Sequence, residues 1–270
     1  MLRTGWCRTA VLVMLGLPLA ARTAAAQIDY RNLDDERPVV TEDAYPIERY
    51  AFELLVPYRY ESEASGEQLH ASILELGYGL LPNTQVGVHF PLAAVRAAGD
   101  TEWGLAGIQP FALYNFNTET RWLPALSLRG DLSLPVGALG GEGIRFTLRA
   151  LATRSWGLTR LHLNAARSFG PEEAFSAAEP APRWSYSLAT DRTVLRSSLL
   201  LVGEIVVARE VREAPVEVNA GIGARWQWTP TLVLDAGLAR RLRDEGPDIG
   251  LTVGLSHAFA LRGLLPDAGR

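Results

Sequence analysis

Histidines are the side chains of this 270-residue chain that most readily do acid–base or metal chemistry, and there are four of them. His89, His162 and His257 occupy positions in regular alternating segments, and His70 lies at the edge of another. A hydrolase needs a nucleophile and a base within hydrogen-bonding reach, and none of the four lies in a recognisable catalytic motif. The sequence also lacks metal-ligand spacing and a phosphate-cradling glycine loop. It therefore predicts no enzyme, no cofactor and no metal site, with a surface hydrolase using His257 as a minor alternative.

Most charged side chains instead alternate with apolar ones. In residues 216–260 apolar residues take every second position in three successive segments, separated at 229–231 and 243–248. Strict alternation over about ten residues is typical of a β-strand. In a soluble barrel the apolar face would fill the interior. In an outer-membrane barrel that face meets lipid, and the polar face lines the lumen.

The same alternation extends back to residue 49 and predicts twelve strands. The fourth is the least regular, because Phe111 and Leu113 break the parity of Ile108 and Tyr114, and Pro110 cannot donate to a strand ladder. The predicted strands cover residues 49–62, 69–80, 84–92, 103–116, 122–136, 144–156, 160–169, a segment beginning at 183, 197–209, and the three C-terminal segments.

Connections and aromatic residues favour a membrane barrel over a soluble one. Turns after even-numbered strands are short, as at 81–83, 117–120 and 157–159, although 190–196 is somewhat longer. Those after odd-numbered strands tend to be long, as at 93–102, 137–143 and 170–182. Outer-membrane barrels have short periplasmic turns, long extracellular loops and two aromatic belts. The predicted aromatic girdle consists of Tyr58, Tyr60, Tyr78, Tyr114, Trp122, Trp156, Trp184, Tyr186, Trp226 and Trp228.

The two ends of the chain differ from this pattern. Residues 1–26 have the positive start, short apolar core and small-residue end of a cleaved signal peptide. Cleavage would remove the only cysteine and three arginines, leaving a net charge of −7 instead of −4, which argues against nucleic-acid binding. Residues 27–48 are acidic and aperiodic, so an exposed leader is the simpler interpretation. The alternative is that they fold back into an arginine-lined lumen as a plug.

Several motifs resemble one known family. Residues 123–137 read LPALSLRGDLSLPVG, residues 223–242 read GARWQWTPTLVLDAGLARRL, and GLSHAF follows further on. Together with Asp35-Glu36-Arg37-Pro38 and Thr41-Glu42, they resemble the outer-membrane transporter family named for the meta-cleavage pathway of phenol degradation. The resemblance covers nearly the whole mature chain and implies a barrel more firmly than any cargo. Such a chain is expected to end at an aromatic residue such as Phe259, but residues 261–270 extend beyond it. This extension departs from the usual C-terminal signal that the barrel-assembly machinery reads.

The sequence thus predicts an all-β, antiparallel up-and-down transmembrane barrel of about twelve strands over residues 49–260, in the outer membrane of a Gram-negative cell. Twelve strands leave either a narrow pore or a plugged lumen. The expected function is passage of small solutes, including aromatic or weakly acidic ones drawn by the arginines; a closed structural or adhesive barrel is the alternative. Opposite charges should pair, Arg129 with Asp131 and Asp235 with Arg241. The residues expected to line the lumen are Glu53, Arg59, Glu75, Arg129, Asp131, Arg145, Arg149, Glu204, Arg225, Asp235 and Arg241.

Overall fold

The computed structural model describes residues 28–63, 66–97, 99–171, 182–195, 198–209, 215–243, 247–261 and 264. These residues form thirteen β-strands in one sheet. No helix in this part of the chain is long and apolar enough to cross a membrane. The expected signal peptide, most of the predicted loop 170–182 and most of the tail 261–270 lie outside the described residues.

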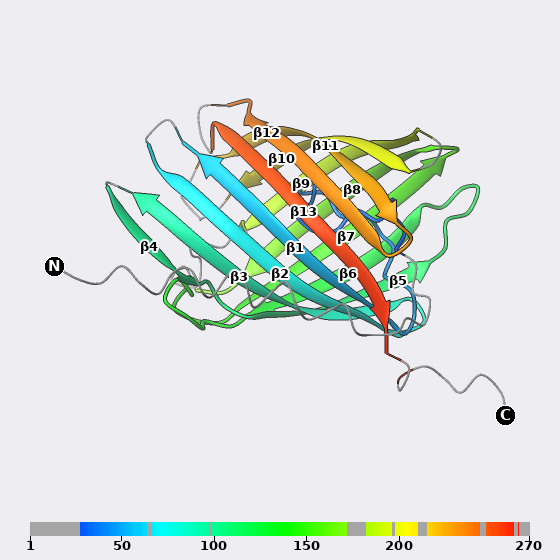
Figure 1. Cartoon of the computed structure of the whole chain (residues 1–270), viewed down its shortest axis with the longest axis horizontal. Coiled ribbons are helices and arrows are strands. Elements are labelled where there is room, and N and C mark those ends of the chain that lie inside the picture. Colours follow the sequence, from blue (N-terminus) through cyan, green and yellow to red (C-terminus); the bar gives the residue numbers. More distant parts are fainter. Residues whose placement is uncertain are drawn as a thin grey trace.

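The strands close into an antiparallel barrel (Figure 1), which confirms the predicted fold class. Sequence neighbours pair around the ring, and the last strand closes it by pairing with the first along twelve residues, from Ala51↔Ala260 to Ser62↔Ile249. The fourth strand pairs with the third alone, so the ring has twelve positions. The strands are β1 (Ala51–Ser62), β2 (Gln68–Leu81), β3 (Thr84–Ala97), β4 (Asp100–Leu105), β5 (Gln109–Asn117), β6 (Ala125–Ser133), β7 (Arg145–Trp156), β8 (Thr159–Phe169), β9 (Trp184–Val194), β10 (Leu199–Arg209), β11 (Glu217–Thr229), β12 (Leu232–Arg241) and β13 (Ile249–Ala260).

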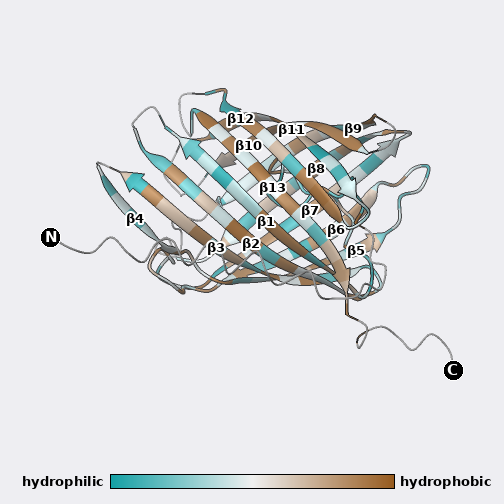
Figure 2. Cartoon of the chain, in the orientation of Figure 1, coloured by the Kyte–Doolittle hydropathy of each residue, from teal (hydrophilic) through white to brown (hydrophobic). Residues whose placement is uncertain are grey.

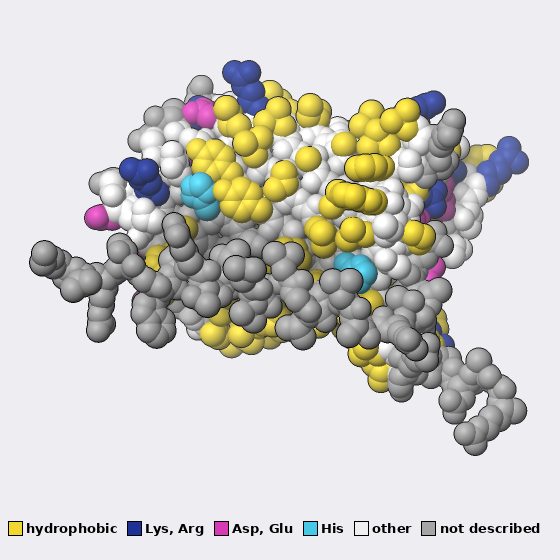
Figure 3. All heavy atoms as spheres, viewed as in Figure 1, with side chains coloured by type: hydrophobic (Ala, Val, Ile, Leu, Met, Phe, Trp, Pro, Cys, Tyr) yellow, Lys and Arg dark blue, Asp and Glu magenta, His cyan; other side chains and the backbone are white. Residues whose placement is uncertain are grey.

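Alternation along each strand separates an apolar outside from a polar bore. On β6, Leu128 is 37% exposed while its neighbour Arg129 is 1% exposed. On β10, Leu201 is 47% exposed and Glu204 is 6% exposed. Figure 2 shows the resulting alternation of hydrophobic and hydrophilic residues along the strands, and Figure 3 shows hydrophobic side chains spread over the outer face. This is the inside-out distribution of a transmembrane barrel.

The predicted fourth strand is two elements, β4 and β5, separated by Ala106–Ile108. Pairing with β3 shifts register there, from Leu92↔Leu105 to His89↔Gln109. Beyond the break, Phe111 and Leu113 are 5% and 1% exposed, so they point into the bore. The parity irregularity in the sequence therefore marks a real change of register followed by an apolar patch inside the barrel.

Two predicted loops are largely strand. Residues 93–102 were expected to form a long loop, but β3 continues to Ala97 and β4 starts at Asp100. Residues 190–196 were expected to form a turn, but β9 continues to Val194. The opposite error occurs between β5 and β6, where the connection spans 118–124 rather than 117–120. The barrel end with residues 82–83, 118–124, 157–158, 195, 198 and 230–231 is called the short-turn rim below, and the other end the long-loop rim.

Candidate functional site in the bore

Residues 28–48, called the leader below, lie inside the barrel. The leader starts at the short-turn rim, where the Ile28 amide donates to the Pro230 carbonyl at 3.0 Å. It returns to the same rim, where the Tyr50 amide donates to the Gly79 carbonyl at 2.7 Å. Between these points the chain reverses at an Asp34↔Arg37 bridge. The interpretation of an exposed leader is therefore wrong for these residues, and the fold-back alternative is the one observed.

Apolar side chains of the leader pack on apolar patches of the bore. Leu33 and Val39 pack with Ala189, Leu200 and Val202. The leader's Ile28 packs with Val233 and Ala258, and its Ala44 packs with Leu113 and Leu151. In a water-filled lumen these apolar wall residues would be exposed to water, which is energetically unfavourable. Their burial under the leader explains why the bore carries them.

The leader approaches the wall closely at glycine positions. A Cβ atom at Gly237 would collide with the Pro38 carbonyl, and one at Gly223 would lie 2.7 Å from the Pro38 Cβ. Nearby, the Glu204 carboxylate accepts hydrogen bonds from the amides of Val40 and Thr41, both at 2.9 Å, and from the Thr41 hydroxyl at 2.7 Å. Because glycine has no Cβ atom, the leader backbone can lie close enough to the wall to bond this carboxylate.

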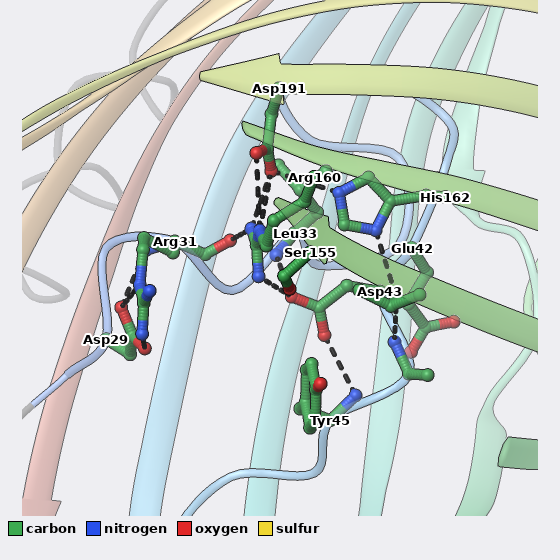
Figure 4. Close-up of polar contacts among 12 residues, drawn as sticks. Asp29, Arg31, Leu33, Glu42, Asp43, Tyr45, Ser155, Arg160, His162 and Asp191 are labelled. Atoms are coloured by element: carbon green, nitrogen blue, oxygen red, sulfur yellow. Dashed lines mark hydrogen bonds and ion pairs between the residues drawn. The ribbon is translucent and has the colours of Figure 1, made fainter. Parts of the chain in front are cut away.

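One cluster fastens the leader to β7, β8 and β9 (Figure 4) and is called the Arg160 cluster. The Arg160 guanidinium contacts Asp43 of the leader at 3.1 Å and Asp191 of β9 at 2.6 Å. His162 lies between Asp191, 3.0 Å from Nε2, and the Thr153 hydroxyl, 3.0 Å from Nδ1. Thr153 Oγ1 in turn accepts the Ala44 amide at 3.0 Å, which ties the leader backbone to the wall.

Asp43 also holds the two arms of the leader together. Its carboxylate accepts the Leu33 amide at 3.2 Å and the Tyr45 amide at 2.9 Å. Burial raises the pKa of Asp43, against the lowering effect of Arg160 and the amides. Sequence reasoning missed Asp191 because it was placed in a turn. The available signal was that Asp191 has the same inward parity as Ser185 and Ser187.

A second cluster, the Arg129 cluster, fastens the leader to β6 and β7. Arg129 bonds Glu42 at 2.9 Å and Asp131 at 3.0 Å, so the predicted Arg129–Asp131 pair is present. Arg149 bonds Asp35 and, at 3.3 Å, the same Glu42. Two arginines of the wall are thus shared between two carboxylates of the leader and one of β6.

Burial affects the leader carboxylates of this region strongly. Burial raises the pKa of Glu42 to about 7, against the opposing attraction of Arg129. Burial likewise raises the pKa of Glu36 to about 7 although Arg59 lies 3.2 Å away. Burial also disfavours the charged form of Asp35, but Arg149 and Arg129 outweigh it and lower the pKa to about 2. Neighbouring carboxylates therefore differ widely in acidity.

A third cluster joins the leader to β11, β12 and β13. Arg37 contacts Asp34 at 2.9 Å and Asp235 at 3.1 Å, and Arg225 contacts Asp34 at 2.6 Å. The prediction that Asp235 pairs with Arg241 is wrong. Arg37 of the leader pairs with Asp235, and Arg241 pairs with Asp248. Arg37 was not among the expected lining residues, because pairing was sought within the wall alone.

The eleven residues expected to line the lumen all carry the inward parity. The structure places Glu53, Glu75, Arg129, Asp131, Arg145, Glu204, Arg225 and Asp235 among the buried residues, and Arg59, Arg149 and Arg241 half-buried. Glu75 bonds His89 at 2.7 Å. Of the ten residues expected in the girdle, the most exposed are Tyr58, Tyr114, Trp122, Trp156, Tyr186, Trp226 and Trp228. Tyr60, Tyr78 and Trp184 are half-buried.

The leader leaves space on both of its sides. A cavity of about 310 Å³ lies at the short-turn side, lined by leader residues at both its ends together with Glu53, Ser155 and Arg160. Toward the long-loop rim, a smaller cavity of about 140 Å³ has the leader's Asp35 and Glu36 among its lining. A third cavity, of about 50 Å³, shares these two acidic residues. The leader thus lies between the open spaces of the two ends.

The histidines form no evident catalytic arrangement on the outside. His257 has outward parity, and its Nδ1 lies 3.0 Å from the Thr231 carbonyl. The Asp191–His162–Thr153 chain has the residue types of a nucleophilic triad, yet all three are buried and Thr153 Oγ1 is occupied by the leader amide. No group of His, Cys, Asp and Glu in the described chain could hold a metal ion.

Comparison with known proteins places the fold. Neither a family model nor a curated protein matches the chain. The structure is similar to an outer membrane channel from Pseudomonas putida F1, with a TM-score of 0.62 and 18% identity, over 84% of this chain and 100% of that chain. It is also similar to the NanC porin (TM-score 0.53, 8% identity, 78% and 100% coverage) and the KdgM porin (0.52, 12%, 76% and 99%). The barrel is of the outer-membrane type. At these identities the likeness concerns the fold alone.

Proposed function

We propose that this protein is an outer-membrane channel that passes small solutes through a lumen narrowed by its own leader. The observation that carries the proposal is the pair of cavities on either side of residues 28–48, inside a barrel with an apolar exterior. Export by a signal peptide, insertion by the barrel-assembly machinery and membership of the phenol-pathway transporter family are parts of this proposal. They rest on residues 1–26 and on the motif resemblance.

The residues that line the third cavity suit an aromatic or weakly acidic solute. Leu55 and Pro57 of β1 and Ile73 of β2 line one side, whereas Arg145 and Arg149 of β7 line another. β1 and β7 lie far apart in the ring, so these two sides belong to different walls of the bore. Such a lining offers an apolar surface to the body of a solute and a guanidinium to an oxyanion.

Planar-bilayer recording tests the proposal. The full-length mature protein should give small unitary conductances, because the leader occupies the lumen. Asp35→Asn with Thr41→Val removes an ion pair to Arg149 and a hydrogen bond to Glu204, so it loosens the leader and should raise the conductance several-fold. Asp248→Asn, which loosens only the Arg241 pair near the long-loop rim, is the control and should leave it unchanged.

A closed structural barrel is the second candidate, and the ion-paired leader filling the bore favours it. The two candidates differ in the recordings. A folded protein that stays silent, with the loosened variant equally silent, would reject the channel and leave the closed barrel. Conductance that rises only in the loosened variant would identify the leader as the barrier.

A further inference from the structure

The charged residues on the outer face of the described strands are all arginines. Within the described strands, every carboxylate has the parity of the bore, as Glu53, Asp131 and Asp235 do. Charged residues with the outward parity are arginines without exception. They are Arg96, Arg154, Arg167, Arg192, Arg209 and Arg240.

These outward arginines lie near the two rims and leave the middle of the apolar band free. Arg154 and Arg192 are near the short-turn rim, and the other four are near the long-loop rim. A long arginine side chain at the edge of a bilayer extends its charge toward the headgroups while its stem stays in the apolar layer. An outside with arginine and no carboxylate complements a negatively charged headgroup layer.

The outward arginines come closest together on β8, β9 and β10. Arg167 is the register partner of Trp184, and Trp184 is the register partner of Arg209. Adjacent strands lie about 4.8 Å apart, so the two arginines are about 10 Å apart across the tryptophan. The Arg209 guanidinium lies 5.8 Å from the Trp184 ring centre, within cation–π range.

Aromatic side chains continue from this row toward the middle of the bilayer. The Tyr186 ring is 5.7 Å from Trp184, and its residue is 57% exposed. Tryptophan and tyrosine in this position mark the level of the lipid headgroups. The row therefore combines two guanidiniums at headgroup level with an aromatic surface for the lipid below.

We infer that Arg167, Trp184 and Arg209 form a binding site for the phosphate groups of an anionic lipid in the outer leaflet. Arginine binds phosphate through two parallel hydrogen bonds, whereas the ammonium group of lysine acts as a point charge. Two arginines on strands about 10 Å apart suit a lipid with two phosphates better than one with a single phosphate. The site rests on the proposed membrane placement and is independent of solute passage.

Native mass spectrometry of the full-length mature protein in detergent tests the site. The probes are a bis-phosphorylated glucosamine lipid, its monophosphorylated form, and phosphatidylcholine. The bis-phosphorylated lipid should bind at least tenfold more tightly than phosphatidylcholine, with the monophosphorylated form between them. Arg167→Gln with Arg209→Gln should lower binding at least tenfold, and the Arg→Lys pair should restore only part of it.

A matched control separates a site from diffuse attraction. Arg96→Gln with Arg240→Gln removes the same charge from the same rim on other strands, and should change binding less than twofold. Equal losses in the two double variants would overturn the site in favour of general electrostatics. Displacement of the lipid by millimolar inorganic phosphate would also overturn it, because a free anion would then suffice. Bilayer conductance of the double variants tells whether the channel proposal fails separately.

Discussion

The Arg160 and Arg129 clusters both fasten the leader to the barrel, but they do so in different ways. In the Arg160 cluster, Asp43 accepts two leader amides as well as the guanidinium, so it joins the two arms of the leader to each other and to β8. In the Arg129 cluster, Glu42 contacts only guanidiniums through its side chain, and it shares them with Asp35. The Arg160 cluster is thus part of the leader's own fold, whereas in the Arg129 cluster the leader is held by ion pairs with the wall.

The largest expected effect comes from removing the centre of the first cluster. Arg160→Gln leaves Asp43 and Asp191 buried without their main cation, and breaking a buried pair in this way costs about 3–5 kcal/mol. Arg149→Gln should cost less than half as much, because Asp35 and Glu42 keep Arg129. Urea unfolding from lipid vesicles, followed by tryptophan fluorescence, measures both.

Adding Asp43→Asn to Arg160→Gln should recover part of the lost stability, because it removes one of the unpaired buried charges. Equal destabilisation by Arg160→Gln and Arg149→Gln would show that the two clusters do not differ as described.

An intermediate effect is expected from pH, and it belongs to the Arg129 cluster and to Glu36 beside it. The pKa of Glu42 and that of Glu36 are raised to about 7, from 4.5, so docking of the leader favours their protonated forms. Docking is then strongest below about pH 4.5 and weakens as pH rises toward 7. Asp35, whose pKa is lowered to about 2, acts in the opposite sense only below its ordinary value of 3.8.

Channel conductance should therefore increase between pH 5 and pH 8. The double variant Glu36→Gln, Glu42→Gln removes these two titrating groups, so its conductance should change much less over this range. A wild-type conductance that falls with rising pH would contradict the assigned role of these carboxylates. An Asp248→Asn variant retains both groups and should follow the wild type.

The barrel was predictable because alternation depends only on neighbouring residues. Each strand needs an apolar side for lipid and a polar side for the bore, and Leu128 beside Arg129 shows both at once. The strand ends were less predictable. Asp191 continues the inward parity of β9, yet the flanking Thr190 and Arg192 look like a polar turn when read without a partner strand.

The leader's position was harder to predict, because composition shows charge but not the partner of that charge. Its carboxylates match the arginines of the bore, but an exposed acidic segment has the same composition. The sharper signal was apolar residues with the wrong parity. Leu113 and Leu151 face a bore that should be polar, and they do so because Ala44 packs on them. A bore with apolar patches indicates that something apolar covers it.

The smallest expected effect concerns the neutral end of the Arg160 cluster. Thr153→Val keeps the shape of the side chain but removes the oxygen that accepts the Ala44 amide and contacts His162. Leaving a buried amide without a partner costs about 1–3 kcal/mol, less than Arg160→Gln. Thr153→Ser retains the hydroxyl and should remain near wild-type stability in the same urea titration. Because Asp43 still holds both arms of the leader, Thr153→Val should lower stability without raising conductance. A conductance increase as large as that of the Asp35→Asn, Thr41→Val variant would instead show that Thr153 makes the main attachment of the leader.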